Sequence, residues 1–177
     1  DKWNSILTKI DHRFNEKDSM SFRYQTRFNR TQGPFDGGSD LGIFGNNVSD
    51  YRSLAGLDWT HIFSPGLLIE FRGGYSRNSE RDRGNFQGRD MSAELGLPSL
   101  VTEQELMDFP KISVLDHFEL GTGASQPVQF HVTDFQFGIK LTWVKSKHVI
   151  KGGFDISRVR YNQPYYNNQR GTYNFQG

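Results

Sequence analysis

Residues 20–29 read MSFRYQTRFN, and apolar and polar residues alternate along this stretch. The even-numbered positions carry Met, Phe, Tyr, Thr and Phe, whereas the odd-numbered positions carry Ser, Arg, Gln, Arg and Asn. Successive side chains of a β-strand point to opposite faces of its sheet. A period of two therefore predicts a strand with one apolar face and one polar face.

The same period recurs along most of the chain. Residues 135–143 read FQFGIKLTW, and the alternation also holds, with a few exceptions, in residues 6–14, 51–63, 67–76 and 150–157. Runs of roughly 10 to 14 residues exceed the usual globular strand and are long enough to cross a bilayer. We therefore expect an all-β chain of about seven long antiparallel strands in up-and-down order.

The connections between these segments alternate in length. The short ones are residues 15–18, 64–66 and 145–147, and the long ones are residues 31–50, 78–129 and 161–170. Outer-membrane barrels combine short periplasmic turns with long extracellular loops. The pattern predicts part of a transmembrane β-barrel in the bacterial outer membrane, with the lipid bilayer as its partner.

Aromatic residues of the apolar parity stand at both ends of the strands. Phe14, Phe63 and Trp143 lie beside the short turns, and Phe28, Tyr51 and Tyr75 lie near the long loops. Aromatic rings favour strands in general, which explains their number but not their placement. We expect these six residues to form aromatic girdles at the two membrane interfaces.

Composition and motifs exclude several other classes of protein. The 177 residues carry 21 Lys and Arg against 20 Asp and Glu, so the basic excess of a nucleic-acid binder is missing. There is no cysteine, no phosphate-binding loop and no nucleophile elbow. We expect no enzymatic activity, no cofactor and no metal. The acidic stretch 36–40 could surround calcium, but it lacks the spacing of an EF-hand loop, so an exposed loop is favoured.

Charged residues of the polar parity are the first group of candidate functional residues. They would line a polar lumen, where they either shape a pathway or only keep the lumen wet. The candidates are Arg23, Arg27, Arg52, Asp58, Glu70, Arg72, Asp134, Lys140, Lys151 and Asp155.

Two of the long loops hold further candidates. Tyr161, Tyr165, Tyr166 and Asn167 could stack on and hydrogen-bond a sugar or peptide, or could simply hydrate an extracellular loop. In the largest loop, residues 102–105 resemble a capping box, which predicts a short helix through Met107. Residues 112–114 are expected to add a short hairpin strand.

Several stretches resemble the barrel of TonB-dependent outer-membrane receptors, in particular the Oar-like branch with an N-terminal carboxypeptidase-regulatory-like domain. The resemblance rests on loose strand and turn patterns in residues 9–14, 63–67, 70–77, 148–155 and 170–175. It implies a barrel of about 22 strands around a plug domain, which the charged lumen candidates would hold by salt bridges and hydrogen bonds. It also implies nutrient uptake driven by the TonB complex, with the nutrient unidentified.

The chain departs from such a receptor in its number of strands. About seven strands would leave two sheet edges unpaired in lipid, which cannot satisfy them. We therefore expect residues 1–177 to be a fragment of a receptor barrel without plug domain or signal peptide. The alternatives are a structural or adhesion barrel without transport and a secreted soluble β-protein.

Overall fold

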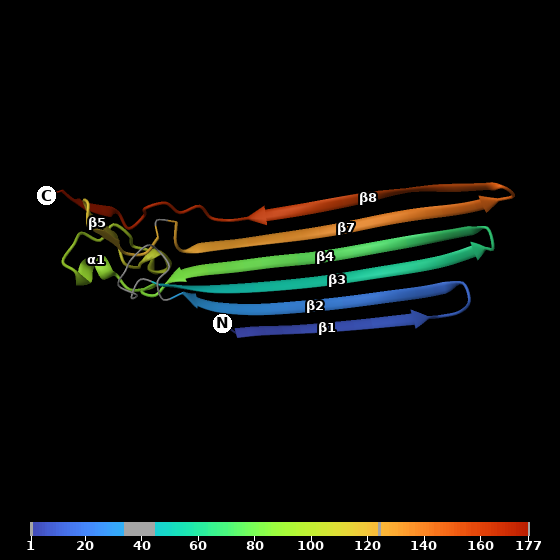
Figure 1. Cartoon of the computed structure of the whole chain (residues 1–177), viewed down its shortest axis with the longest axis horizontal. Coiled ribbons are helices and arrows are strands. Elements are labelled where there is room, and N and C mark those ends of the chain that lie inside the picture. The colour runs from blue at the N-terminus through green and yellow to red at the C-terminus, as the bar shows by residue number, and fades with distance from the viewer. Residues whose placement is uncertain (1, 34–44, 124, 177) are drawn as a thin grey trace.

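The computed structural model describes residues 2–33, 45–123 and 125–176, and its main feature is a sheet of six long antiparallel strands (Figure 1). The strands follow one another in the sheet in the order β1-β2-β3-β4-β7-β8, so the sheet is an up-and-down meander. They are β1 (Lys2–Arg13), β2 (Asp18–Gly33), β3 (Asn46–Ser64), β4 (Leu67–Gly84), β7 (Val128–Lys145) and β8 (His148–Asn162). With 12 to 19 residues, each is long enough to cross a bilayer at a tilt.

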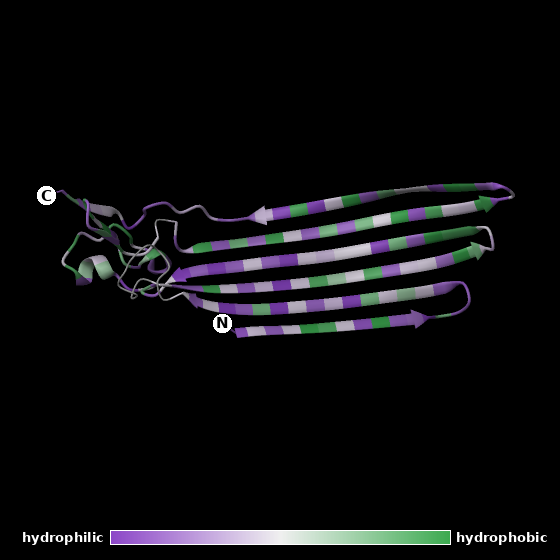
Figure 2. Ribbon diagram, in the orientation of Figure 1, coloured by the Kyte–Doolittle hydropathy of each residue, from purple (hydrophilic) through white to green (hydrophobic). Residues whose placement is uncertain are grey.

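The register keeps the apolar parity of every strand on one face of the sheet. Tyr75 of β4, for example, lies opposite Ala55 of β3 and Phe135 of β7. The pairing shifts once, between Ile62 and Ser64, next to a short turn. Figure 2 shows the result as alternating polar and apolar bands along each strand. We call the apolar face the outward face and the charged face the inward face.

Short turns join the strands at one end of the sheet, and the long connections lie at the other (Figure 1). In the first turn, Oδ1 of Asn15 accepts hydrogen bonds from the backbone N–H groups of Lys17 and Asp18, at 2.7 and 2.9 Å. Residues 65–66 and 146–147 form two-residue connections. The predicted asymmetry between the two ends is confirmed.

No described element covers the outward face. Phe137 is 48% exposed and Phe154 is 61% exposed, although both lie in the middle of strands. The buried hydrophobic residues among those described, Met91, Leu106 and Phe109, all belong to the connection between β4 and β7. Because the sheet has no core of its own, its apolar face must be covered by something outside this chain's described part.

Residues 85–123, 125–127 and 163–176 fold together at the loop end, and we call them the outer subdomain. Its elements are α1 (Met91–Glu94), the 3-10 helix η1 (Gln104–Leu106), β5 (Lys111–Val114), β6 (Phe118–Leu120) and β9 (Thr172–Phe175). The predicted strand at residues 112–114 is confirmed as β5, which pairs with β6 in a hairpin and with β9 in parallel. Neither helix in the described residues has the length and apolarity to span a membrane.

Two expectations differ from the structure. Six long strands are found in the described chain where about seven were expected, because residues 172–175 pair with β5 and form no seventh long strand. The short helix expected through Met107 is found as η1, but its capping box is not, since the N-cap residue is Glu103 and makes no side-chain hydrogen bond to the helix. Residues 36–40, the possible calcium loop, lie outside the described residues.

Candidate functional site

All ten charged residues predicted to line a lumen project from the inward face. The register places residues of one parity from each strand together, and these ten share it. Three of them lie closer to the loops, Arg27, Arg52 and Asp134, and Arg23 lies in the turn-side half of β2, apart from the rest. The other six lie in the turn-side half of the sheet: Asp58, Glu70, Arg72, Lys140, Lys151 and Asp155. We call these six the inward charge cluster.

The inward charge cluster lines one groove of about 480 Å³ that runs over β3, β4, β7 and β8. Its ion pairs join residues that lie directly opposite each other on neighbouring strands. Nε of Arg72 donates to Oδ1 of Asp58 at 2.9 Å, and Nζ of Lys140 lies 3.0 Å from Oε2 of Glu70. The cluster is therefore made by register, with three acidic and three basic groups that balance in charge.

Gly138 leaves room within the cluster for the carboxylate of Asp155. Arg72, Gly138 and Asp155 lie in one row across β4, β7 and β8. A Cβ at position 138 would clash with Oδ1 of Asp155. Because Gly138 has no side chain, the Asp155 carboxylate lies over β7. No side chain therefore stands between Asp155 and Arg72 along this row.

The cluster is open to a binding partner. The side chain of Arg72 is 82% exposed although it is ion-paired, and its guanidinium has five donors. Exposed pairs of this kind contribute little stability by themselves, about 0 to 1 kcal/mol. The charged groups of the cluster are suited to binding polar or charged partners of either sign, and less to catalysis.

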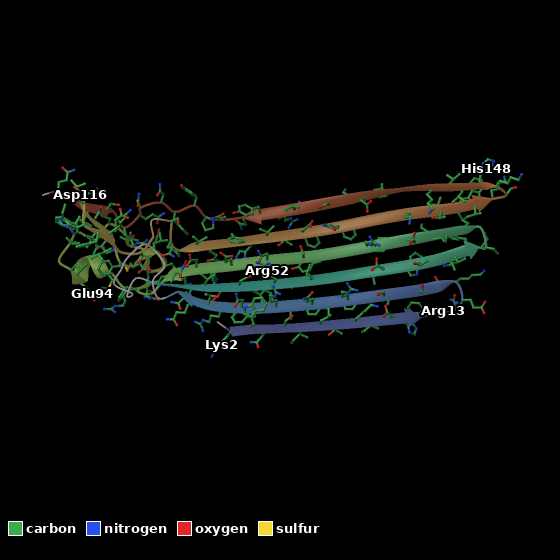
Figure 3. The ribbon with its side chains drawn as sticks, viewed as in Figure 1. Lys2, Arg13, Arg52, Glu94, Asp116 and His148 are labelled. Atoms are coloured by element: carbon green, nitrogen blue, oxygen red, sulfur yellow. The ribbon has the colours of Figure 1, made fainter. Side chains whose placement is uncertain are left out.

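The loop-side half of the inward face is less regular. Arg27 and Arg52 lie directly opposite each other, which is unfavourable for two like charges. Each has its own partner, because Arg52 pairs with Asp50 at 3.1 Å and the guanidinium of Arg27 lies 4.3 Å from the centroid of the Trp3 ring. Figure 3 marks Arg52 in this part of the sheet.

The predicted ligand-contact residues of the last connection do not form one site. Tyr161 belongs to β8, and its ring stacks on Phe130 with centroids 6.3 Å apart. Tyr166 lines a groove of about 330 Å³ beside the outer subdomain. Tyr165 is 81% exposed, and Asn167 is exposed as well. Ligand contact by these residues stays a prediction.

The six aromatic residues predicted for the membrane interfaces lie at the two ends of the apolar part of the outward face. Phe14 and Phe63 each pack edge-on against a histidine two residues earlier, with ring centroids 4.5 Å apart. Phe28 lies directly opposite Tyr51. Tyr75 packs against Phe135, and Trp143 lies opposite Leu67 and Ile150. Their positions fit two girdles, and their interfacial role stays a prediction.

Sequence reasoning missed a buried polar cluster in the outer subdomain. The Arg170 guanidinium donates to the carbonyls of Leu106, Gln126 and Gly123 at 3.2, 2.8 and 2.9 Å. Oδ1 of Asp108 accepts from the Thr122 hydroxyl at 2.8 Å and from the backbone N–H of Phe109 at 2.8 Å. The cluster ties the last connection to the largest one. Nothing in the local sequence around Arg170 indicates which carbonyls it binds.

Burial shifts the pKa values of both charged groups in this polar cluster. It raises the pKa of the Asp108 carboxyl above its ordinary value and lowers the pKa of the Arg170 guanidinium. With 3% and 6% exposure, the two residues are structural. Within the described ranges, no three His, Cys, Asp or Glu side chains are grouped so that they could hold a metal ion.

Long meandering strands, an uncovered apolar face, a charged opposite face and loops gathered at one end define a membrane-spanning β-barrel sheet. The chain belongs to the outer membrane beta barrel domain family, whose family model matches residues 1–177. The predicted fold class and the location in the bacterial outer membrane are thereby confirmed. No curated protein and no solved structure matches the chain.

Proposed function

We propose that this chain forms part of the barrel of a TonB-dependent outer-membrane receptor, in which the inward charge cluster contacts the receptor's plug domain. The observation that carries the proposal is the balanced and exposed set of charges on rigid neighbouring strands. The resemblance of residues 9–14, 63–67, 70–77, 148–155 and 170–175 to such receptors supports it. The role proposed is binding and transport of a nutrient, without catalysis.

The open edges of the sheet support a larger barrel. In the described part of the chain, β1 pairs with β2 and β8 pairs with β7, so each has one strand edge without a ladder. Lipid cannot hydrogen-bond those backbone groups, and membrane strands avoid the cost by closing into a barrel. We propose that further strands of the same protein complete the barrel on both sides of this sheet.

The internal ion pairs suit a surface that must release its partner. If a charge of the lumen had its only partner on the plug, release of the plug would leave that charge unpaired in a confined lumen, which costs free energy. Arg72 is paired with Asp58, and Lys140 with Glu70, within this sheet, so these charges do not need the plug as a partner. The energy delivered through the TonB complex would then break contacts that each contribute little, because exposed ion pairs are weak.

A cross-linking experiment tests the plug contact. A photo-activated benzoylphenylalanine is placed at Lys140, on the inward face, or at the adjacent Ile139, on the outward face, in the full-length protein in cells. We expect cross-links from position 140 to peptides of the same protein outside residues 1–177, and none of these from position 139. Cross-links from neither position, or equal cross-links from both, would contradict the proposal.

A structural or adhesion barrel is the second candidate. The observation in its favour is the outer subdomain, in which Met91 and Phe109 form a small core at the loop end. Such a barrel would keep its function in cells that lack the TonB complex. A receptor would lose uptake in those cells, so this comparison separates the two candidates.

A further inference from the structure

The two faces of the sheet carry opposite charge at the loop end. On the outward face, arginines follow the last apolar residues of three strands, and we call them the outer basic belt: Arg30 of β2, Arg77, Arg81 and Arg83 of β4, and Arg158 and Arg160 of β8. Among the strand residues that the structure describes, no Asp or Glu lies on this face on the loop side of the aromatic residues. The acids at this end, Asp50, Glu80 and Asp82, project inward.

The first arginines of the belt run obliquely across the strands. Arg30 lies in the same row as Arg81 and Gln129, whereas Arg158 lies opposite Phe135. Between β2 and β8 the boundary thus moves six residues towards the short turns, or about 20 Å along the strands, over four strand spacings of about 4.8 Å. That slope is about 45°, the tilt of strands in outer-membrane barrels. The first arginines therefore lie at one level of the bilayer.

A groove of about 400 Å³ lies inside the belt. Ser49 pairs with both Arg30 and Arg81, so the two arginines flank one hydroxyl on the outward face. Arg83 also lines the groove, and Phe28 and Tyr51 line its apolar side. The three arginines are exposed. Guanidinium groups bind phosphate oxygens in bidentate fashion, so the groove has the chemistry of a phosphate site with acyl chains below it.

The outer basic belt extends further along the membrane normal than the polar layer of a phospholipid bilayer. Arg77 and Arg83 are six residues apart, which at a 45° tilt separates them by about 14 Å along the membrane normal. The polar layer on each side of a phospholipid bilayer is only about 5 to 8 Å thick. Cations at several depths therefore match a lipid with a thick headgroup that carries several anionic groups.

We propose that the outer basic belt binds the phosphate groups of a phosphorylated glycolipid in the outer leaflet. The site needs the barrel and its orientation, but not transport or a plug domain. It faces the membrane and is separate from the inward charge cluster, which opens on the other side of the sheet.

The test measures binding of fluorescent rough lipopolysaccharide to the detergent-solubilised full-length protein. The variant is R30Q/R81Q/R83Q, and its matched control is K17Q/K145Q/K147Q, which removes three cations from the short-turn end. An arginine near an anionic surface contributes about 1 kcal/mol, or about fivefold in affinity. We therefore expect the arginine variant to bind on the order of a hundredfold more weakly, and the control to stay within about threefold of the unchanged protein.

Two competition measurements distinguish the possible sources of the phosphate group. Vesicles of phosphatidylglycerol should compete weakly, and 10 mM inorganic phosphate should not compete. The variant R30K/R81K/R83K keeps the three charges but loses the bidentate geometry of the guanidinium, so it should bind more weakly than the unchanged protein and more tightly than the glutamine variant. The free energy of unfolding of the glutamine variant should match that of the control, which separates a loss of binding from a loss of fold. Equal loss in the control, unchanged binding by the glutamine variant, or full competition by phosphatidylglycerol or free phosphate would overturn the proposal.

Discussion

The substitution Ile139→Arg places a cation at the centre of the outward face. Ile139 lies four residues from both Phe135 and Trp143, so at a tilt of about 45° it is roughly 9 Å from either end of the apolar band. Its neighbours in the row are Phe71 and Phe154, which offer no acceptor. An arginine at the midplane of a membrane barrel costs about 2 to 4 kcal/mol, because its charge must leave water or deform the bilayer.

Two further variants give this prediction its controls. Gln136→Arg points inward between Gly74 and Ser157, where water and small neighbours accommodate it, so we expect a change of less than about 0.5 kcal/mol. Phe135→Arg lies at the edge of the band, where the penalty for the cation itself falls to about 0 to 1 kcal/mol. The assay is the free energy of unfolding of the full-length protein in phosphatidylcholine vesicles, followed by fluorescence in guanidinium. Equal losses for Ile139→Arg and Gln136→Arg would refute the assignment of the faces.

Three other predictions concern packing and burial. Gly153→Ala should destabilise the barrel by about 1 to 3 kcal/mol, because a Cβ there meets the Ile139 carbonyl oxygen, whereas Gly152→Ala, which meets no atom within 4 Å, should be tolerated in the same unfolding assay. Arg170→Met should weaken the outer subdomain by about 3 kcal/mol, since one buried and two partly buried carbonyls lose their donor, and hydrogen exchange of its amides measures the loss. The raised pKa of Asp108 means that its contribution to stability is fully present below its unfolded pKa of about 4 and is lost as pH rises through the folded value. Protection of the Thr122 amide, corrected for the intrinsic exchange rate, should therefore be greater at pH 4 than at pH 7, and the opposite trend would contradict this.

The sheet could be predicted from the sequence because its signal is local. Each long strand carries the period of two in its own residues, and the turns at Asn15 and at residues 65–66 and 146–147 interrupt it. Residues 172–175 show the limit of this reasoning. These residues form a short strand, but the partner of a strand depends on distant residues, and here the partner is β5.

The inward face was predicted in composition but not in detail. Parity alone assigns Arg72 and Asp155 to one face, and it needs no knowledge of neighbouring strands. That Arg72 meets Asp58, and that Gly138 leaves room for Asp155, depends on register. Register is fixed by turn geometry and by the packing of whole strands, so a single sequence does not reveal it.

The outer subdomain was the least predictable part. Its helices are shorter than two turns, so they show no helical period. The capping-box pattern at residues 102–105 makes no cap, whereas Asp90, which stands in no capping box, caps α1 through the Ala93 amide at 3.0 Å. In the sequence, Arg170 stands out only as the first residue of the receptor-like stretch 170–175. Its role comes from three carbonyls that are 44 to 64 residues away along the chain.

Accessibility along β7 tests the central claim most directly. The chain has no cysteine, so single cysteines can be introduced at each position from 133 to 143 and labelled with nitroxide in the full-length protein in vesicles. We expect odd-numbered positions from 135 to 143 to be accessible to oxygen dissolved in lipid, and even-numbered positions to be accessible to a water-soluble nickel chelate. A profile without a period of two, or one with the two parities exchanged, would contradict it.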